Sequence, residues 1–124
     1  MAVRTYRDLL AWQRGMDFAE AVYKTTDCLP KNEEYGLKVQ LRRAAVSIPS
    51  NIAEGQGRQS TGEFLQFLGH ARGSLLEAET QVLLASRLGY FSSEQAETLL
   101  KLGSAIARVL NGLISSLGGS RREK

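Results

Sequence analysis

Residues 40–58, QLRRAAVSIPSNIAEGQGR, carry the most varied side-chain chemistry of this 124-residue chain. At about 100° per residue, one set of polar side chains falls within a narrow band of a helix, beside an apolar face. This polar row consists of Gln40, Arg43, Ser47, Asn51 and Glu54. It suits a hydrogen-bond network inside a bundle or between subunits, a nucleic-acid surface, or a catalytic site. Since buried polar side chains usually have partners, we favour the structural network, with nucleic-acid contact second and catalysis last.

The charged members of the polar row need partners from outside it. Arg43 and Glu54 lie about 16 Å apart along a straight helix, so they do not pair with each other. We expect their partners on a second chain or on neighbouring helices, where the candidates are Asp17, Glu20, Glu77 and Glu79. Pro49 cannot donate a backbone hydrogen bond, which predicts a kink in this helix.

The histidine and the cysteine do not indicate a reaction centre. One histidine, His70, and one cysteine, Cys28, do not complete a tetrahedral zinc site. Cys28 also has no neighbouring base to activate it as a nucleophile. The glycines of GQGR lack the strand and the lysine of a phosphate loop, so they indicate the end of a helix. The sequence therefore predicts a protein that is not an enzyme and holds no metal or cofactor.

Basic side chains offer contacts for phosphate groups. The candidate nucleic-acid-binding residues are Arg4, Arg7, Arg14, Lys38, Arg42, Arg43, Arg121 and Arg122, joined by Lys124. The formal net charge of +3 and the pI of about 9.2 are too mild to establish a nucleic-acid-binding protein. If these residues bind RNA or DNA, they do so by attraction to phosphates and not by reading bases; the alternative is a solvated surface.

Apolar spacing predicts four helices. The first spans 6–27 with a Thr5–Asp8 cap, the second spans 33–55, the third follows a capping box at 60–63, and the fourth follows a Ser92–Gln95 cap and ends at Gly118 and Gly119. Short loops favour an all-α fold, an antiparallel up-down-up-down four-helix bundle. We expect one domain over 1–119 and a flexible basic tail over 120–124.

The same spacing predicts which helix faces form the core. For the first helix the predicted face is Leu9, Trp12, Met16, Ala19, Tyr23 and Thr26. For the second helix it is Leu37, Leu41, Ala44, Ile48 and Ile52. For the third it is Phe64, Leu68, Ala71, Leu75, Ala78, Val82 and Ala85, and for the fourth it is Ala96, Leu99, Gly103, Ile106, Leu110, Leu113 and Leu117. Gly69 and Gly73 predict close approach of a neighbouring backbone. The aromatic residues Trp12, Tyr23, Phe64 and Phe67 are expected in the core.

A further apolar line lies on the far side of the second helix. Val39, Val46 and Ala53 recur every seventh residue, which is more apolar surface than a lone bundle helix needs. This line predicts an interface between copies of the chain.

The chain has the features of a soluble cytoplasmic protein. Its single cysteine cannot form an internal disulfide, which fits a reducing compartment. No signal core and no run of about 20 apolar residues is present, so we expect no membrane partner.

Several blocks of this sequence carry a family resemblance. LAWQ at 10–13, EEYGLKVQLRRAAVSIPSNIAEGQGR at 33–58, EFLQFLGHARGSLLEAETQ at 63–81 and LGY at 88–90 resemble the four-helix-bundle proteins encoded in intervening sequences of bacterial 23S rRNA genes. SIPSNIAEG is the most distinctive block, and the resemblance covers about 6–91. The resemblance implies that the chain forms a homopentamer. The accessory protein of diversity-generating retroelements is similar to this family and works with a reverse transcriptase and nucleic acid, so the resemblance also implies a role beside nucleic acid. A ring of five copies would concentrate the mild positive charge.

Two functions follow from these features. The first is a non-enzymatic, homopentameric helical bundle that associates with RNA or DNA through a basic surface. The alternative is a protein-interaction scaffold or accessory subunit that does not bind nucleic acid directly.

Overall fold

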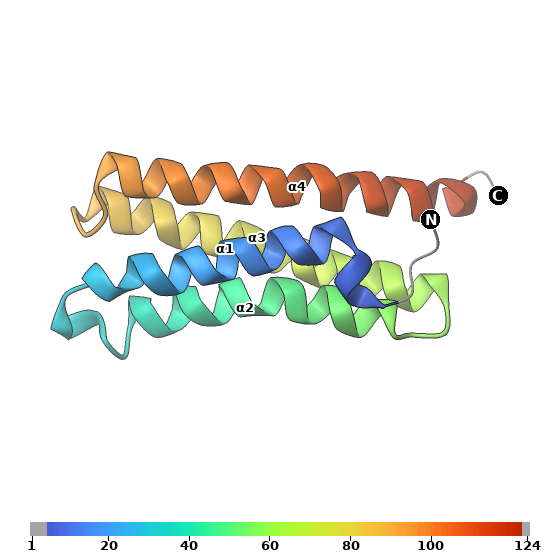
Figure 1. Ribbon diagram of the computed structural model, residues 1–124, viewed down its shortest axis with the longest axis horizontal. Coiled ribbons are helices and arrows are strands. Elements are labelled where there is room, and N and C mark those ends of the chain that lie inside the picture. The colour runs from blue at the N-terminus through green and yellow to red at the C-terminus, as the bar shows by residue number, and fades with distance from the viewer. Residues whose placement is uncertain (1–4, 123–124) are drawn as a thin grey trace.

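Four long helices form an antiparallel bundle in the computed structural model, which describes the backbone of residues 5–122 and the side chains of residues 5–118 (Figure 1). The helices are α1 (Leu10–Thr25), α2 (Leu37–Gln56), α3 (Thr61–Arg87) and α4 (Ser93–Arg122). Three short 3-10 helices accompany them, η1 (Tyr6–Asp8), η2 (Thr26–Cys28) and η3 (Lys31–Glu33). α1 and α3 each pack against both α2 and α4, so they occupy diagonal corners. The all-α bundle is therefore confirmed.

No helix in the described part of the chain is long and apolar enough to cross a membrane.

The first predicted helix is shorter than expected. Thr5 and Asp8 do form a capping box, in which the Thr5 hydroxyl accepts from the Arg7 amide at 3.0 Å. This cap starts η1, because Leu9 is extended (φ −75°, ψ 124°) and separates η1 from α1. At the other end the chain tightens into η2 after Thr25.

The second predicted helix begins later than expected, at Leu37 instead of Glu33. Gly36 has non-helical dihedrals (φ −112°, ψ −108°) and interrupts the chain after η3. The Glu33 carboxylate accepts a hydrogen bond from the Leu37 amide at 2.9 Å, which satisfies one of the free N–H groups at the start of α2. From there α2 continues through Pro49 to Gln56.

The caps of the third and fourth helices are confirmed. The Ser60 hydroxyl accepts from the Glu63 amide at 3.1 Å, and the Ser92 hydroxyl accepts from the Gln95 amide at 3.1 Å. Gly89, with φ +79°, makes the turn between α3 and α4.

α4 extends to Arg122, so its predicted end at the glycine pair 118–119 is wrong. Glycine within an existing helix costs only about 1 kcal/mol, which elongation of a long helix tolerates.

The predicted core faces of α2, α3 and α4 are largely confirmed. The buried residues that belong to them are Leu37, Leu41, Ala44, Ile48 and Ile52; Leu68, Ala71, Leu75, Ala78, Val82 and Ala85; and Ala96, Leu99, Gly103, Ile106 and Leu110. Phe64, Leu113 and Leu117 are partly buried against this core, and Phe67 is also partly buried.

α1 is rotated relative to its predicted face. Met16 and Tyr23 are 45% and 44% exposed, so their predicted place in the core is wrong, and Leu9 and Trp12 are only partly buried. Of the predicted face, the core holds Ala19 and Thr26, and the other buried residues of α1 are Ala11, Gly15, Phe18 and Val22.

The buried side of α1 lies close to α2 at Gly15. A Cβ atom built on Gly15 would lie 3.4 Å from both Ile48 Cγ2 and Pro49 Cβ, which is van der Waals contact, so the two helices pack closely at this position. The predicted close approach at Gly69 and Gly73 is wrong, because both are exposed with no atom within 4 Å of such a Cβ. Among the described glycines, Gly15, Gly55 and Gly103 are the ones that pack against a neighbouring helix.

Candidate functional site

An apolar groove runs along the surface between α1 and α2, which lie side by side (Figure 1). Its volume is about 570 Å³. The lining residues are Tyr6, Trp12, Met16, Ala19, Glu20 and Tyr23 from the first helical region, and Val46, Pro49, Ser50 and Ala53 from α2.

The groove joins two sequence patterns that were predicted to have different roles. Trp12, Met16 and Tyr23 belong to the face of α1 that was expected in the core. Val46 and Ala53 belong to the apolar line of α2 that was expected at a subunit interface. Val39, the third member of that line, is exposed but does not line the groove. The rotation of α1 therefore places both patterns on one continuous outer surface.

Aromatic contacts hold the end of the groove near η1. The rings of Tyr6 and Trp12 meet edge to face, with centroids 5.2 Å apart and planes at 70°. The Arg7 guanidinium carbon lies 5.7 Å from the centroid of the Tyr6 ring. The Gln13 amide donates to the Arg7 carbonyl at 2.8 Å, which connects this end to α1.

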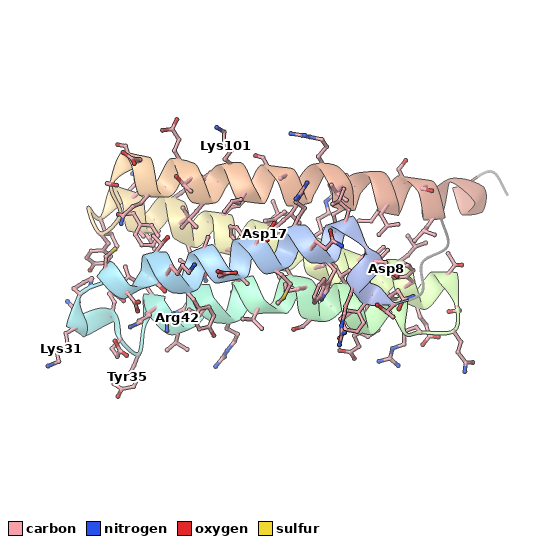
Figure 2. The ribbon with its side chains drawn as sticks, in the orientation of Figure 1. Asp8, Asp17, Lys31, Tyr35, Arg42 and Lys101 are labelled. Atoms are coloured by element: carbon pink, nitrogen blue, oxygen red, sulfur yellow. The ribbon has the colours of Figure 1, made fainter. Side chains whose placement is uncertain are left out.

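Arg42 lies at the Tyr23 end of α1 and joins α2 to it (Figure 2). Its Nε donates to the Thr26 hydroxyl at 2.8 Å, and its Nη2 donates to the Tyr23 carbonyl at 3.0 Å and to Asp27 Oδ1 at 3.1 Å. Lys38 lies one turn earlier, 3.2 Å from Glu34 and 4.0 Å from Asp27. Lys38 and Arg42 therefore already have protein partners.

The remaining predicted phosphate contacts differ in availability. Arg14 lies 3.8 Å from Asp17. Arg43 is exposed and makes no hydrogen bond or ion pair with any described residue. The side chains of Arg4, Arg121, Arg122 and Lys124 lie outside the described residues. The side chain of Arg7 is also exposed, and its one contact among the described residues is with the Tyr6 ring, so Arg7 and Arg43 are the predicted contacts most available for a phosphate group.

The polar row of α2 separates into an inner and an outer part. Ser47 and Ser74 of α3 share a hydrogen bond of 2.8 Å, and the Asn51 amide donates to the Ser47 carbonyl and hydroxyl at 2.8 Å each. These three side chains are partly buried between α2 and α3.

Gln40, Arg43 and Glu54 form the outer part of the row and are exposed. Glu54 pairs with Arg58 at 3.0 Å, beyond the end of its own helix, and none of the four expected carboxylates contacts Arg43. The expected partners of Arg43 and Glu54 on neighbouring helices are therefore wrong within the described chain. The reason is geometric, because these residues turn away from the α2–α3 contact toward solvent.

A polar line on α3 was missed in the sequence. Ser74 and Gln81 are seven residues apart and lie on the same side of α3. Gln81 is buried, and its amide donates to Glu77 at 3.4 Å, whereas its Oε1 has no partner among the described residues. Their seven-residue spacing beside the apolar seam was the signal that could have identified this line.

Two carboxyl groups have shifted pKa values, one that lines the groove and one that packs between α3 and α4. The pKa of Glu20 is lowered by its hydrogen bond to Lys24 and by the charge of that lysine, so it remains ionised at neutral pH. Burial raises the pKa of Glu79, which packs at Gly103. The described residues contain no cluster of three metal-ligating side chains. A groove lined mostly by aromatic and aliphatic groups is suited to binding another apolar surface.

Comparison with known proteins places these features in a family. The family described as 23S rRNA-intervening sequence protein matches residues 7–112. A solved structure of a protein of unknown function, from the S23 ribosomal protein family of Bacteroides thetaiotaomicron, superposes with a TM-score of 0.76. It is 26% identical, over 85% of this chain and 98% of that chain. No curated protein matches the chain.

Proposed function

Since the chain belongs to the family of 23S rRNA-intervening sequence proteins, we propose that it is a non-enzymatic scaffold that assembles as a homopentamer and binds RNA or DNA through a basic surface. The groove between α1 and α2 is the observation that carries this proposal. Neither the matched family nor the similar structure is described by a reaction, which supports a binding role.

The composition of the groove supports self-association. Met16, Tyr23 and Val46 expose large apolar groups next to one another. Contiguous apolar patches of this kind are unusual on monomeric proteins and mark binding sites. Removal of such surface from water contributes about 25 cal/mol per Å², which would stabilise an assembly of copies.

The position of Arg43 supports nucleic-acid binding by the assembly. Arg43 lies three residues before Val46, so the two are neighbours on the outer side of α2. An interface that buries Val46 would therefore bring Arg43 close to each subunit boundary. Repetition around a ring would multiply a charge that is weak in one chain and attract phosphates without base recognition.

One observation favours the alternative function, an accessory subunit that binds a protein. Tyr35 is 94% exposed at the end of the bundle where α1 connects to α2 (Figure 2). Exposed tyrosines are enriched at protein interfaces. Arg14, Lys38 and Arg42 are already paired with carboxylates, so fewer cations remain for phosphates than the sequence indicated.

The mass of the protein in solution tests the assembly. We expect the wild-type chain to sediment as a multiple of 13.6 kDa, and Val46→Glu to sediment as a monomer because an unpaired carboxylate is costly to bury. Ser104→Glu, at an exposed position of α4, is the matched control and should assemble normally. A monomeric wild-type protein would contradict the proposal.

The proposed nucleic-acid binding is tested by titrating the protein with structured RNA and with duplex DNA at several salt concentrations. Fluorescence anisotropy measures the affinity. We expect affinity that falls steeply with salt and is reduced several-fold by Arg43→Gln. Lys101→Gln provides a control, because Lys101 projects from the outer side of α4 (Figure 2). Absence of binding at low salt would exclude nucleic acid. Recovery of one defined protein after nuclease treatment would then support the accessory-subunit function.

A further inference from the structure

A second apolar surface lies on the outer side of α3. We call it the leucine row, and it consists of Leu76, Leu83, Leu84 and Leu88. Leu76 and Leu83 are 58% and 51% exposed, whereas Leu75 and Val82, one residue before each, are buried in the core. Gly69 and Gly73 extend the same side without obstructing it, because nothing lies within 4 Å of a Cβ built on either.

The leucine row and the groove are distinct surfaces of the same chain. The groove lies between α1 and α2, whereas the row lies on α3, at the corner of the bundle diagonal to α1. The groove is hollowed between two helices, and the row projects from a single helix. A helix with an apolar outer face fits into a groove of this kind.

Ring symmetry requires two different surfaces. A contact between identical patches closes after two copies, whereas a ring of five copies needs a heterologous contact in which one surface of each subunit meets a different surface of the next. We propose that the groove of one copy receives the leucine row of the next copy. This inference rests on the proposed self-association and specifies its geometry.

Charge complementarity supports a second copy as the occupant of the groove. Glu20 is the one charged residue among those that line the groove, and it is acidic; in the single copy its partner is Lys24, at 2.8 Å on the exposed surface. Two arginines lie beside the leucine row, Arg72 before its first leucine and Arg87 before its last; both are exposed and make no ion pair with the described residues. Each of these arginines lies four residues outside an exposed leucine, Leu76 or Leu83, and so on the same helical side.

The lengths of the two surfaces also agree. At 1.5 Å per residue, the groove from Trp12 to Tyr23 extends about 16 Å, and the leucine row from Leu76 to Leu88 extends about 18 Å. The two arginines are about 22 Å apart on the same scale. The leucine row and the groove are therefore of similar length.

Mixing two complementary variants tests this arrangement. Val46→Glu blocks the groove and leaves the row intact, whereas the double variant Leu76→Glu, Leu83→Glu blocks the row and leaves the groove intact. We expect each to be monomeric alone. When mixed in equal amounts they should form a complex of one copy of each, because the intact row of the Val46→Glu variant can enter the intact groove of the double variant. No further copy can add, because the remaining groove and the remaining row of this pair are the mutated ones. Native mass spectrometry with one isotopically labelled variant identifies this pair.

Other outcomes would overturn the inference. Wild-type-like assembly of the double variant would show that the row is not part of the interface, while the self-association of the proposed function would stand. Two monomeric variants that fail to combine would exclude the groove–row contact. A monomeric wild-type protein would overturn both proposals. Circular dichroism must show unchanged helicity for each variant, and Leu76→Gln, Leu83→Gln replaces the double variant if it does not fold.

Discussion

Arg42 of α2 stacks on the ring of Tyr23 of α1, with its guanidinium carbon 4.4 Å from the ring centroid. The same guanidinium donates to the Thr26 hydroxyl, which is fully buried. The arginine therefore covers a polar atom inside the bundle and packs against the end of the groove. Its neighbour Arg43 has none of these contacts, so two adjacent arginines that look equivalent in the sequence have different roles.

Replacement of the two arginines should separate these roles. We expect Arg42→Ala to lower the free energy of unfolding by about 2 kcal/mol, through loss of the hydrogen bond to Thr26 and of the stacking on Tyr23. Asp27 is 77% exposed, so its ion pair adds little. Arg43→Ala should change stability by less than about 0.5 kcal/mol. Urea denaturation measures both, and equal effects would refute the distinction.

Gly55 should not tolerate even a methyl group. A Cβ atom at this position would lie 2.6 Å from Phe67 Cβ and 3.0 Å from Phe64 Cδ1. Gly55→Ala is therefore expected to destabilise the bundle by about 1–3 kcal/mol through overpacking. Gly112→Ala is the matched control, since that position is open, and it should raise stability by up to about 1 kcal/mol. Thermal denaturation compares them; a stabilising Gly55→Ala would contradict the close packing.

The hydrogen bond between Ser47 and Ser74 should couple α2 to α3. Each serine-to-alanine variant is expected to lose about 1 kcal/mol of stability, because its partner stays partly buried without the bond. The double variant should lose less than the two single losses combined, which a double-mutant cycle measures. Strict additivity would mean that the bond contributes nothing.

The carboxyl group of Glu79 should make stability depend on pH. Burial raises the pKa of Glu79 in the folded protein, so the folded state binds its proton more tightly than the unfolded state does. Stability should therefore fall as the pH rises from below the ordinary glutamate pKa of about 4.3 through the higher folded value. Glu79→Gln should remove this decrease and be more stable than wild type at neutral pH only. Glu97→Gln, which is exposed on α4, should leave the profile unchanged.

Features that depend on neighbours within one helical turn were predictable from the sequence. The caps at Ser60 and Ser92 are formed by side chains three residues apart in the sequence, so local patterns identify them. The seam of α3 repeats over six turns with a single orientation, and its burial follows directly. The start of α2 was missed because apolar spacing alone does not reveal the break at Gly36, which is not helical. The cap on the Leu37 amide comes from the side chain of Glu33, which the same spacing had placed inside the helix.

The sequence by itself determined four amphipathic helices, the family and the two apolar sets that line the groove, the predicted face of α1 and the apolar line of α2. Only the tertiary structure decided which side of α1 turns inward. That helix has two apolar sides, one with the larger Trp12, Met16 and Tyr23 and one with Ala11, Gly15 and Phe18, and a period of 3.6 residues fits both. The smaller side is buried because it lets the two helices pack closely: a Cβ atom at Gly15 would already be in van der Waals contact with Ile48 and Pro49 of α2. This contact between distant parts of the chain leaves the larger side on the surface as the groove.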